Sequence, residues 1–272
     1  VSELSADLRK AIANLATHEG LEEAGIVVRV GDGVAWVHGL TNAGYSEVLE
    51  IESDKGTIEA FALNLMEDEI GAVLLGDENY VKAGAKVRLK GELLTVPVGP
   101  ELLGRVVDPL GRPLDGGPAI TTAQRGLVER PAVGVMGRKS VHEPLMTGIM
   151  SIDAMFPIGR GQRELVIGDR QIGKTALCVD AIIAQKNTDV HCIYVAIGQK
   201  QSTVALVVEA LRKHGAMDYT TVVAACASDP APMQYVSAFA GCAMGEYFRD
   251  NGQHALIIYD DLSKQAVSYR EV

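Results

Sequence analysis

Motifs for a metal centre or an activated nucleophile are missing from this chain of 272 residues. Its four cysteines stand far apart, without a Cys-x-x-Cys pair, and its six histidines form no His-x-x-x-His or His-Glu-x-x-His spacing. A dedicated transition-metal site is therefore not expected, and the cysteines are predicted to be free thiols in a reducing compartment. The chain also has no Gly-x-Ser-x-Gly sequence, so no serine nucleophile of the hydrolase type is expected.

Long apolar runs and an excess of basic residues are missing as well. No stretch approaches the roughly 20 apolar residues that span a bilayer, and residues 1–5 lack the basic-then-apolar layout of a signal peptide. Lys and Arg number 25 against 35 Asp and Glu, a formal net charge of -10. This balance argues against a surface built to hold nucleic-acid phosphates or anionic lipid. We expect no nucleic-acid partner, and only an indirect membrane role.

The composition that is present, 47% hydrophobic and 22% charged, is typical of a globular protein with one large or two modest domains. Residues 1–24 form the first segment. Four apolar residues, Leu4, Leu8, Ile12 and Leu15, recur there at helical spacing and predict a short amphipathic helix. Such a helix either packs on its own protein or binds a partner, and the sequence slightly favours the first.

Residues 25–97 are predicted to form a small closed β-barrel. Short β-rich runs alternate with turn sequences that contain Gly, Asp and Asn. The expected strands are Ile26–Val30, Val34–His38, Glu47–Ile51, Thr57–Asn64, Gly71–Leu75 and Lys86–Val96. Six short strands at close intervals favour closure, because a closed barrel has no exposed sheet edge. Pro97 marks the exit from the barrel.

Residues 98–272 are predicted to form a parallel-sheet α/β domain. A Gly- and Pro-rich connection occupies residues 98–162, and strands then alternate with helices. The expected strands are 164–167, 191–197, 221–225 and 255–259, and the expected helices lie near 174–186, 201–214 and 231–249. This alternation indicates a mainly parallel sheet, whose ligands gather at the carboxyl ends of the strands.

A phosphate-binding loop lies at the start of this domain. Eight consecutive residues fit G-x-x-x-x-G-K-[ST] throughout: Gly168, Asp169, Arg170, Gln171, Ile172, Gly173, Lys174 and Thr175. In such a loop the glycines let backbone amides converge on phosphate oxygens, Lys174 supplies a charge to the outer phosphates, and the Thr175 hydroxyl can ligate Mg²⁺. The match follows an apolar strand and opens a helical run, which is the context that this chemistry needs.

A carboxylate for the magnesium ion is expected at the end of another strand. Residues 255–259 form an apolar run that ends in Asp260 and Asp261. Asp260 is predicted to hold Mg²⁺ through a water molecule, because this ion gives up its hydration shell reluctantly. Asp261 is a candidate helix cap.

The predicted site lacks a catalytic base at the usual place. In parallel-sheet ATPases a carboxylate at the end of the strand after the phosphate-loop helix commonly activates water. Here that strand ends in Gly198-Gln199-Lys200, and the Gln199 amide cannot accept a proton near neutral pH. We therefore expect nucleotide binding with little turnover. Two alternatives stay open: a base on another loop, or Gln199 positioning the water adequately.

Seven stretches of the chain closely resemble the alpha-subunit family of F-type ATP synthases. They are Leu103–Asp115, Ser140–Pro144, Met155–Arg163, Gly168–Thr175, Tyr194–Lys200, Gly241–Asp250 and Ala255–Val267. The resemblance implies a small N-terminal β-barrel followed by a RecA-type P-loop domain. It also implies that Gln171, Gly173, Lys174, Thr175 and Ala176 line a non-catalytic site for ATP or ADP with Mg²⁺.

The resemblance further implies partners and a location. Alpha subunits alternate with beta subunits in a ring of three of each around a central shaft subunit, with a peripheral stalk subunit near the N-terminal segment. Such a complex uses a proton gradient to make ATP from ADP and phosphate. It is peripheral to an energy-transducing membrane, on the cytoplasmic face of the plasma membrane in bacteria, and the chain would meet the membrane only through the complex.

Three positions depart from the family pattern: Met150 where Lys is common, Ile172 where Thr is usual, and Ala176 where Ser is frequent. None removes a phosphate-binding charge. The family also continues well beyond Val272, so the nucleotide-binding domain is expected to be incomplete at its C-terminal end.

Two other functions remain open from the sequence. A self-sufficient ring-forming P-loop ATPase, such as an RNA-translocating helicase, shares the order of barrel and RecA-type domain. Its barrel should carry base-stacking aromatics with basic neighbours, whereas aromatics are only 5% here and Trp36 sits among apolar residues that favour a core position. The third possibility is an inert fragment, which would show no cooperative thermal transition.

Overall fold

The computed structural model describes residues 24–272, and the chain divides into two compact units between Leu93 and Leu94. The helix expected over residues 1–24 lies outside the described residues, apart from Ala24, which begins the first strand. The first unit had been expected to run to residue 97. Each unit is described by itself.

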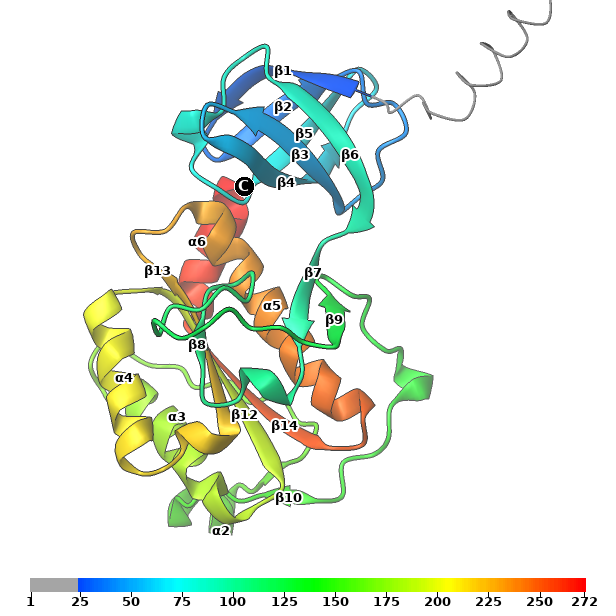
Figure 1. The fold of residues 1–272 in the computed structure, drawn as a ribbon. Helices are drawn as coiled ribbons and strands as arrows, with labels where there is room; N and C mark the ends of the chain where they lie inside the picture. Colours follow the sequence, from blue (N-terminus) through cyan, green and yellow to red (C-terminus); the bar gives the residue numbers. More distant parts are fainter. Residues whose placement is uncertain (1–23) are drawn as a thin grey trace, which may run out of the picture. The chain divides into compact units, whose positions relative to one another are not determined.

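The first unit is a closed antiparallel barrel with the strand order β1-β2-β5-β4-β3-β6 (Figure 1). Its strands are β1 (Ala24–Gly31), β2 (Val34–His38), β3 (Glu47–Ser53), β4 (Gly56–Leu65), β5 (Glu69–Leu74) and β6 (Lys86–Leu93), and a 3₁₀ turn η1 (Glu78–Tyr80) precedes β6. Alternate side chains of these strands fill the interior, as the period of two requires. Leu49, Ile51 and Leu74 are fully buried there. All six expected strands are present, and five of them match their expected bounds to within a few residues.

Two barrel details differ from the expectation. The run Lys86–Val96 is not one strand: β6 ends at Leu93, and β7 (Thr95–Val98) pairs with β9 (Gln124–Leu127) in a separate two-stranded sheet. Pro97 lies inside β7, which a two-stranded sheet tolerates because each strand has a free edge. Trp36 is also not part of the core. It is only partly buried, and the Arg29 guanidinium lies 4.3 Å from its ring centroid.

The second unit is built on a four-stranded parallel sheet with the order β14-β12-β13-β8. The strands are β8 (Val106–Val107), β12 (Val190–Gln199), β13 (Thr220–Cys226) and β14 (His254–Asp260), and the helices are α3 (Lys174–Ile183), α4 (Gln201–Lys213), α5 (Ala231–Asp250) and α6 (Leu262–Glu271). The shorter elements are η2 (Pro100–Leu102), η3 (Val135–Gly137), β10 (Pro144–Leu145), α2 (Met150–Met155), β11 (Ile158–Gly159), η4 (Ala184–Asn187) and η5 (Met217–Tyr219).

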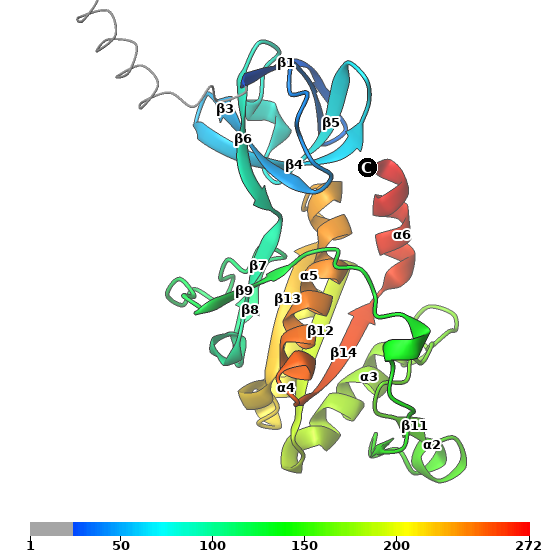
Figure 2. The same cartoon turned by 90° about the vertical axis from the view of Figure 1, so that its right-hand side faces the viewer.

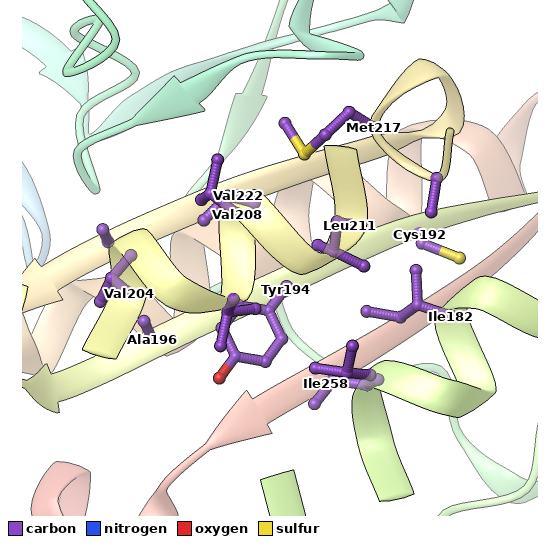
Figure 3. Packing of buried hydrophobic residues seen from close by; sticks show 14 of the residues in the cluster. Ile182, Cys192, Tyr194, Ala196, Val204, Val208, Leu211, Met217, Val222 and Ile258 are labelled. Carbon is purple, nitrogen blue, oxygen red and sulfur yellow. The ribbon is translucent and has the colours of Figure 1, made fainter. Parts of the chain in front are cut away.

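The sheet is covered on both faces, as a parallel sheet requires. On one face, Ile182 of α3 and Leu211 of α4 pack with Tyr194 of β12 in a continuous core (Figure 3). On the other face runs the long helix α5 (Figure 2), whose Gly241 lies against Val195 of β12. The helices and three of the four strands expected in this domain are confirmed to within a few residues.

The strand expected over residues 164–167 is not formed. The segment pairs with no strand in the described part of the chain, and Leu165 and Ile167 are 72% and 83% exposed. A buried strand is stabilised by ladder hydrogen bonds and by cover on both faces. Because residues 164–167 have neither, their apolar sequence alone does not make them a strand.

Candidate nucleotide-binding site

The phosphate loop leads directly into helix α3. Gly173 is the N-cap of this helix, with φ 97° and ψ 11°, and no side chain caps the first turn. A residue with a Cβ is strained in this left-handed conformation, whereas glycine is not. A β-carbon at Gly173 would meet no atom within 4 Å, so the space in front of the cap is open. The first-turn amides of α3 are therefore available to an anion, which the helix dipole also favours.

Lys174 is folded back onto its own loop. Its Nζ donates to the carbonyl oxygen of Gly168 at 2.6 Å and also to that of Asp169. Residues 168–173 and Ala176 are exposed, whereas Lys174 and Thr175 are partly buried. The structure thus holds the ammonium group at the loop and leaves the loop accessible. The middle of the loop is exposed, at Asp169, Arg170, Gln171 and Ile172.

The carboxylate of Asp260 is the meeting point of three elements. It ends strand β14, and its Oδ2 accepts from the hydroxyl of Thr175 on α3 at 2.7 Å. The same oxygen accepts from the hydroxyl of Tyr194 on β12 at 2.8 Å. Oδ1 accepts from Nε2 of Gln199, the last residue of β12, at 3.1 Å, and the same amide reaches the Asp260 carbonyl oxygen at 3.3 Å. The structure therefore brings together Thr175, Asp260 and Gln199, which the sequence analysis had selected separately.

Asp261 has a separate role. Its Oδ1 accepts from the backbone N–H of Lys264 at 2.9 Å, and it is the N-cap of α6. This is the capping geometry expected of an aspartate before a helix.

Sequence reasoning missed Tyr194, whereas Cys178 is a free thiol as expected. Burial, reinforced by the nearby Asp260, raises the pKa of the Tyr194 hydroxyl, so it acts as a neutral donor. Burial also raises the pKa of the Cys178 thiol to about 11, with Asp260 contributing, so this thiol is neutral near pH 7. A buried tyrosine needs a partner for its hydroxyl, which is the signal that could have singled out Tyr194.

Comparison with known proteins identifies the domains. The model of the ATP synthase alpha/beta family, beta-barrel domain, matches residues 21–91. A second model, of the ATP synthase alpha/beta family, nucleotide-binding domain, matches residues 148–272. The chain belongs to the ATP synthase alpha/beta family.

Curated relatives carry the name ATP synthase subunit alpha. The protein from Desulfotalea psychrophila is 63% identical over 270 residues, which are 99% of this chain and 53% of the relative. Those from Lawsonia intracellularis and Desulfovibrio desulfuricans are 54% and 55% identical, with the same coverage. The chain thus spans about half the length of the curated relatives it matches.

The residues present fit a magnesium nucleotide. Mg²⁺ prefers hard oxygen ligands, and the Thr175 hydroxyl and the Asp260 carboxylate supply them within 2.7 Å of each other. The uncapped start of α3 and Lys174 suit the phosphates.

Within residues 24–272 there is no cluster of three or more His, Cys, Asp or Glu side chains placed to hold a metal ion. In the same range no helix is both long and apolar enough to cross a bilayer.

Proposed function

We propose that this chain is a nucleotide-binding alpha-type subunit of a rotary ATP synthase, whose own site holds Mg-ATP or Mg-ADP without cleaving it. The proposal rests mainly on the position of Gln199 at the end of β12, next to Asp260. Its amide donates to Asp260 at 3.1 Å, at the end of the strand where a hydrolytic site needs a carboxylate. An amide can orient a water molecule but cannot take its proton near neutral pH.

The proposed roles follow from the chemistry of each group. Amides of residues 168–176 bind phosphate oxygens, and Lys174 neutralises the outer phosphates after leaving the loop carbonyls that it contacts now. The bound Mg²⁺ would neutralise phosphate charge. Thr175 would be its direct ligand, and Asp260 would hold it through a water molecule.

The proposed setting is a ring in which this chain alternates with beta subunits around a central shaft, with a peripheral stalk subunit at the N-terminal end. Proton flow would drive ATP synthesis mainly in beta, and the complex would be peripheral to an energy-transducing membrane. The support is the name and identity of the relatives, 54–63% over nearly all of this chain. An RNA helicase is less well supported, because the curated relatives carry the name ATP synthase subunit alpha.

Co-expression with a beta subunit tests this setting. The expected result is a heteromeric complex by native mass measurement, because the family's members work as rings of unlike subunits. Lys174→Ala should leave the ATP turnover of that complex within about twofold, if turnover belongs to beta. Recovery of separate monomers only, or loss of turnover in the variant, would contradict the proposal.

A further inference from the structure

One of the hydrogen-bond donors to the Asp260 carboxylate comes from the buried interior of the domain. Thr175 and Gln199 stand at element ends, where the loop and the strand terminus can adjust. Tyr194 lies in mid-strand, is 1% exposed, and packs in the core between the sheet and helices α3 and α4. Figure 3 shows its ring inside that core with the hydroxyl oxygen directed away from the packed carbons.

The strand register explains how this contact forms. Tyr194 is paired with Ile258, and Ala196 is paired with Asp260. Residues two apart on a strand share a face, so all four side chains are on the face covered by α3 and α4. Ala196, beside Asp260, has only a methyl side chain and no hydrogen-bond donor for the carboxylate. The Tyr194 ring therefore extends along the strand direction and brings its hydroxyl to Oδ2 at 2.8 Å.

We propose that Tyr194 is a positioning residue that fixes the Asp260 carboxylate for magnesium, so that the Mg²⁺ affinity of the nucleotide-loaded site depends on its hydroxyl. The inference rests on the proposed function for its ligand. A hydroxyl group is a donor as well as an acceptor, so Thr175 can keep its bond to Oδ2 while its lone pairs face the ion. Asp260 then needs a second fixed donor to keep Oδ2 turned toward Thr175, and Tyr194 supplies it.

Tyr194→Phe removes the hydroxyl and keeps the ring in the core, so it isolates this contact. Tyr219→Phe is the matched control. Tyr219 is partly buried and packs against the same core, and its hydroxyl donates to the carbonyl oxygens of Ile182 and Ile183, away from Asp260. Both variants remove a tyrosine hydroxyl that donates in partly buried surroundings, and only the first affects the carboxylate.

The test measures, by calorimetry on the 272-residue chain, the affinity for ATP in EDTA and the affinity for Mg-ATP in excess Mg²⁺. The ratio of the two gives the Mg²⁺ affinity of the nucleotide-loaded site relative to that of free ATP. Tyr194→Phe should weaken Mg²⁺ binding about tenfold, the equivalent of one charge-assisted hydrogen bond. Its metal-free ATP affinity should match that of the wild type, and Tyr219→Phe should change neither quantity. Equal Mg²⁺ affinity in wild type and Tyr194→Phe, or an equal loss in both variants, would overturn the inference.

Crystal structures without nucleotide provide a second readout that does not need ATP to bind. The Thr175–Asp260 contact should persist in wild type and Tyr219→Phe, and the Asp260 side chain should turn away or occupy two conformers in Tyr194→Phe. A single unchanged Asp260 conformer in Tyr194→Phe would overturn the inference. Absence of ATP binding by the wild type would instead count against the proposed function.

Discussion

Lys174 is the only side-chain cation that the structure holds on the described phosphate loop through hydrogen bonds to loop carbonyls. A charge-assisted hydrogen bond contributes about 1.5–3 kcal/mol. Lys174→Ala should therefore weaken Mg-ATP binding roughly ten- to a hundredfold, measured by equilibrium titration. The backbone amides would account for the residual affinity.

Lys186→Ala is the control for this prediction. It removes the same charge from η4, beyond the opposite end of α3, where Lys186 is exposed and donates to the His214 carbonyl oxygen at 3.3 Å. ATP affinity should be unchanged in this variant. Equal weakening in both variants would mean that net charge, and not the loop, governs binding.

At the same scale, sequence could select Lys174, Thr175, Asp260 and Gln199, since each follows from a spacing or from the end of a strand. It also supported their proximity, because the carboxyl ends of neighbouring parallel strands meet at one edge. The contact of Tyr194 with Asp260 could not be predicted in this way. It depends on the pairing of Tyr194 with Ile258, and sequence periodicity does not set the register between two strands that are about sixty residues apart.

At the scale of elements, the approach of α5 to the sheet depends on Gly241. A β-carbon there would collide with the Val195 side chain and lie 3.7 Å from that of Ile193. Gly241→Ala should lower the free energy of unfolding by about 1–3 kcal/mol through overpacking, although alanine is the better helix former. The midpoint of urea unfolding measures this change.

Gly134→Ala is the matched substitution for that experiment. Gly134 has φ -64° and ψ 165°, and an added β-carbon would meet no atom within 4 Å. Its effect on stability should stay below about 1 kcal/mol. If Gly241→Ala were as stable as wild type, the packing of α5 on β12 would be looser than described.

The expected elements differ in outcome for a physical reason. The barrel strands, β12 and the three long helices carry a strong period of two, a buried run or a helical pattern, and each finds the partner that its pattern requires. Residues 164–167 have an apolar run as well, but no strand in the described chain pairs with them. A sequence pattern indicates which side chains are apolar enough to be buried. It does not indicate whether another strand or helix packs against them.

At the scale of the whole molecule, the proposed function requires that the chain retain a nucleotide and leave it intact. The barrel and the parallel-sheet unit are assigned by two models of one family. The claim of retention rests on the loop and Lys174, and the claim of no cleavage rests on Gln199 beside Asp260.

The most direct test incubates the purified 272-residue chain with Mg-ATP, removes free nucleotide, and identifies what is bound by chromatography over several hours. We predict an equimolar amount of intact ATP on the wild-type chain and far less on Lys174→Ala, with no steady release of ADP. Accumulation of ADP in molar excess over the protein, or a wild-type chain that retains no nucleotide, would contradict this prediction.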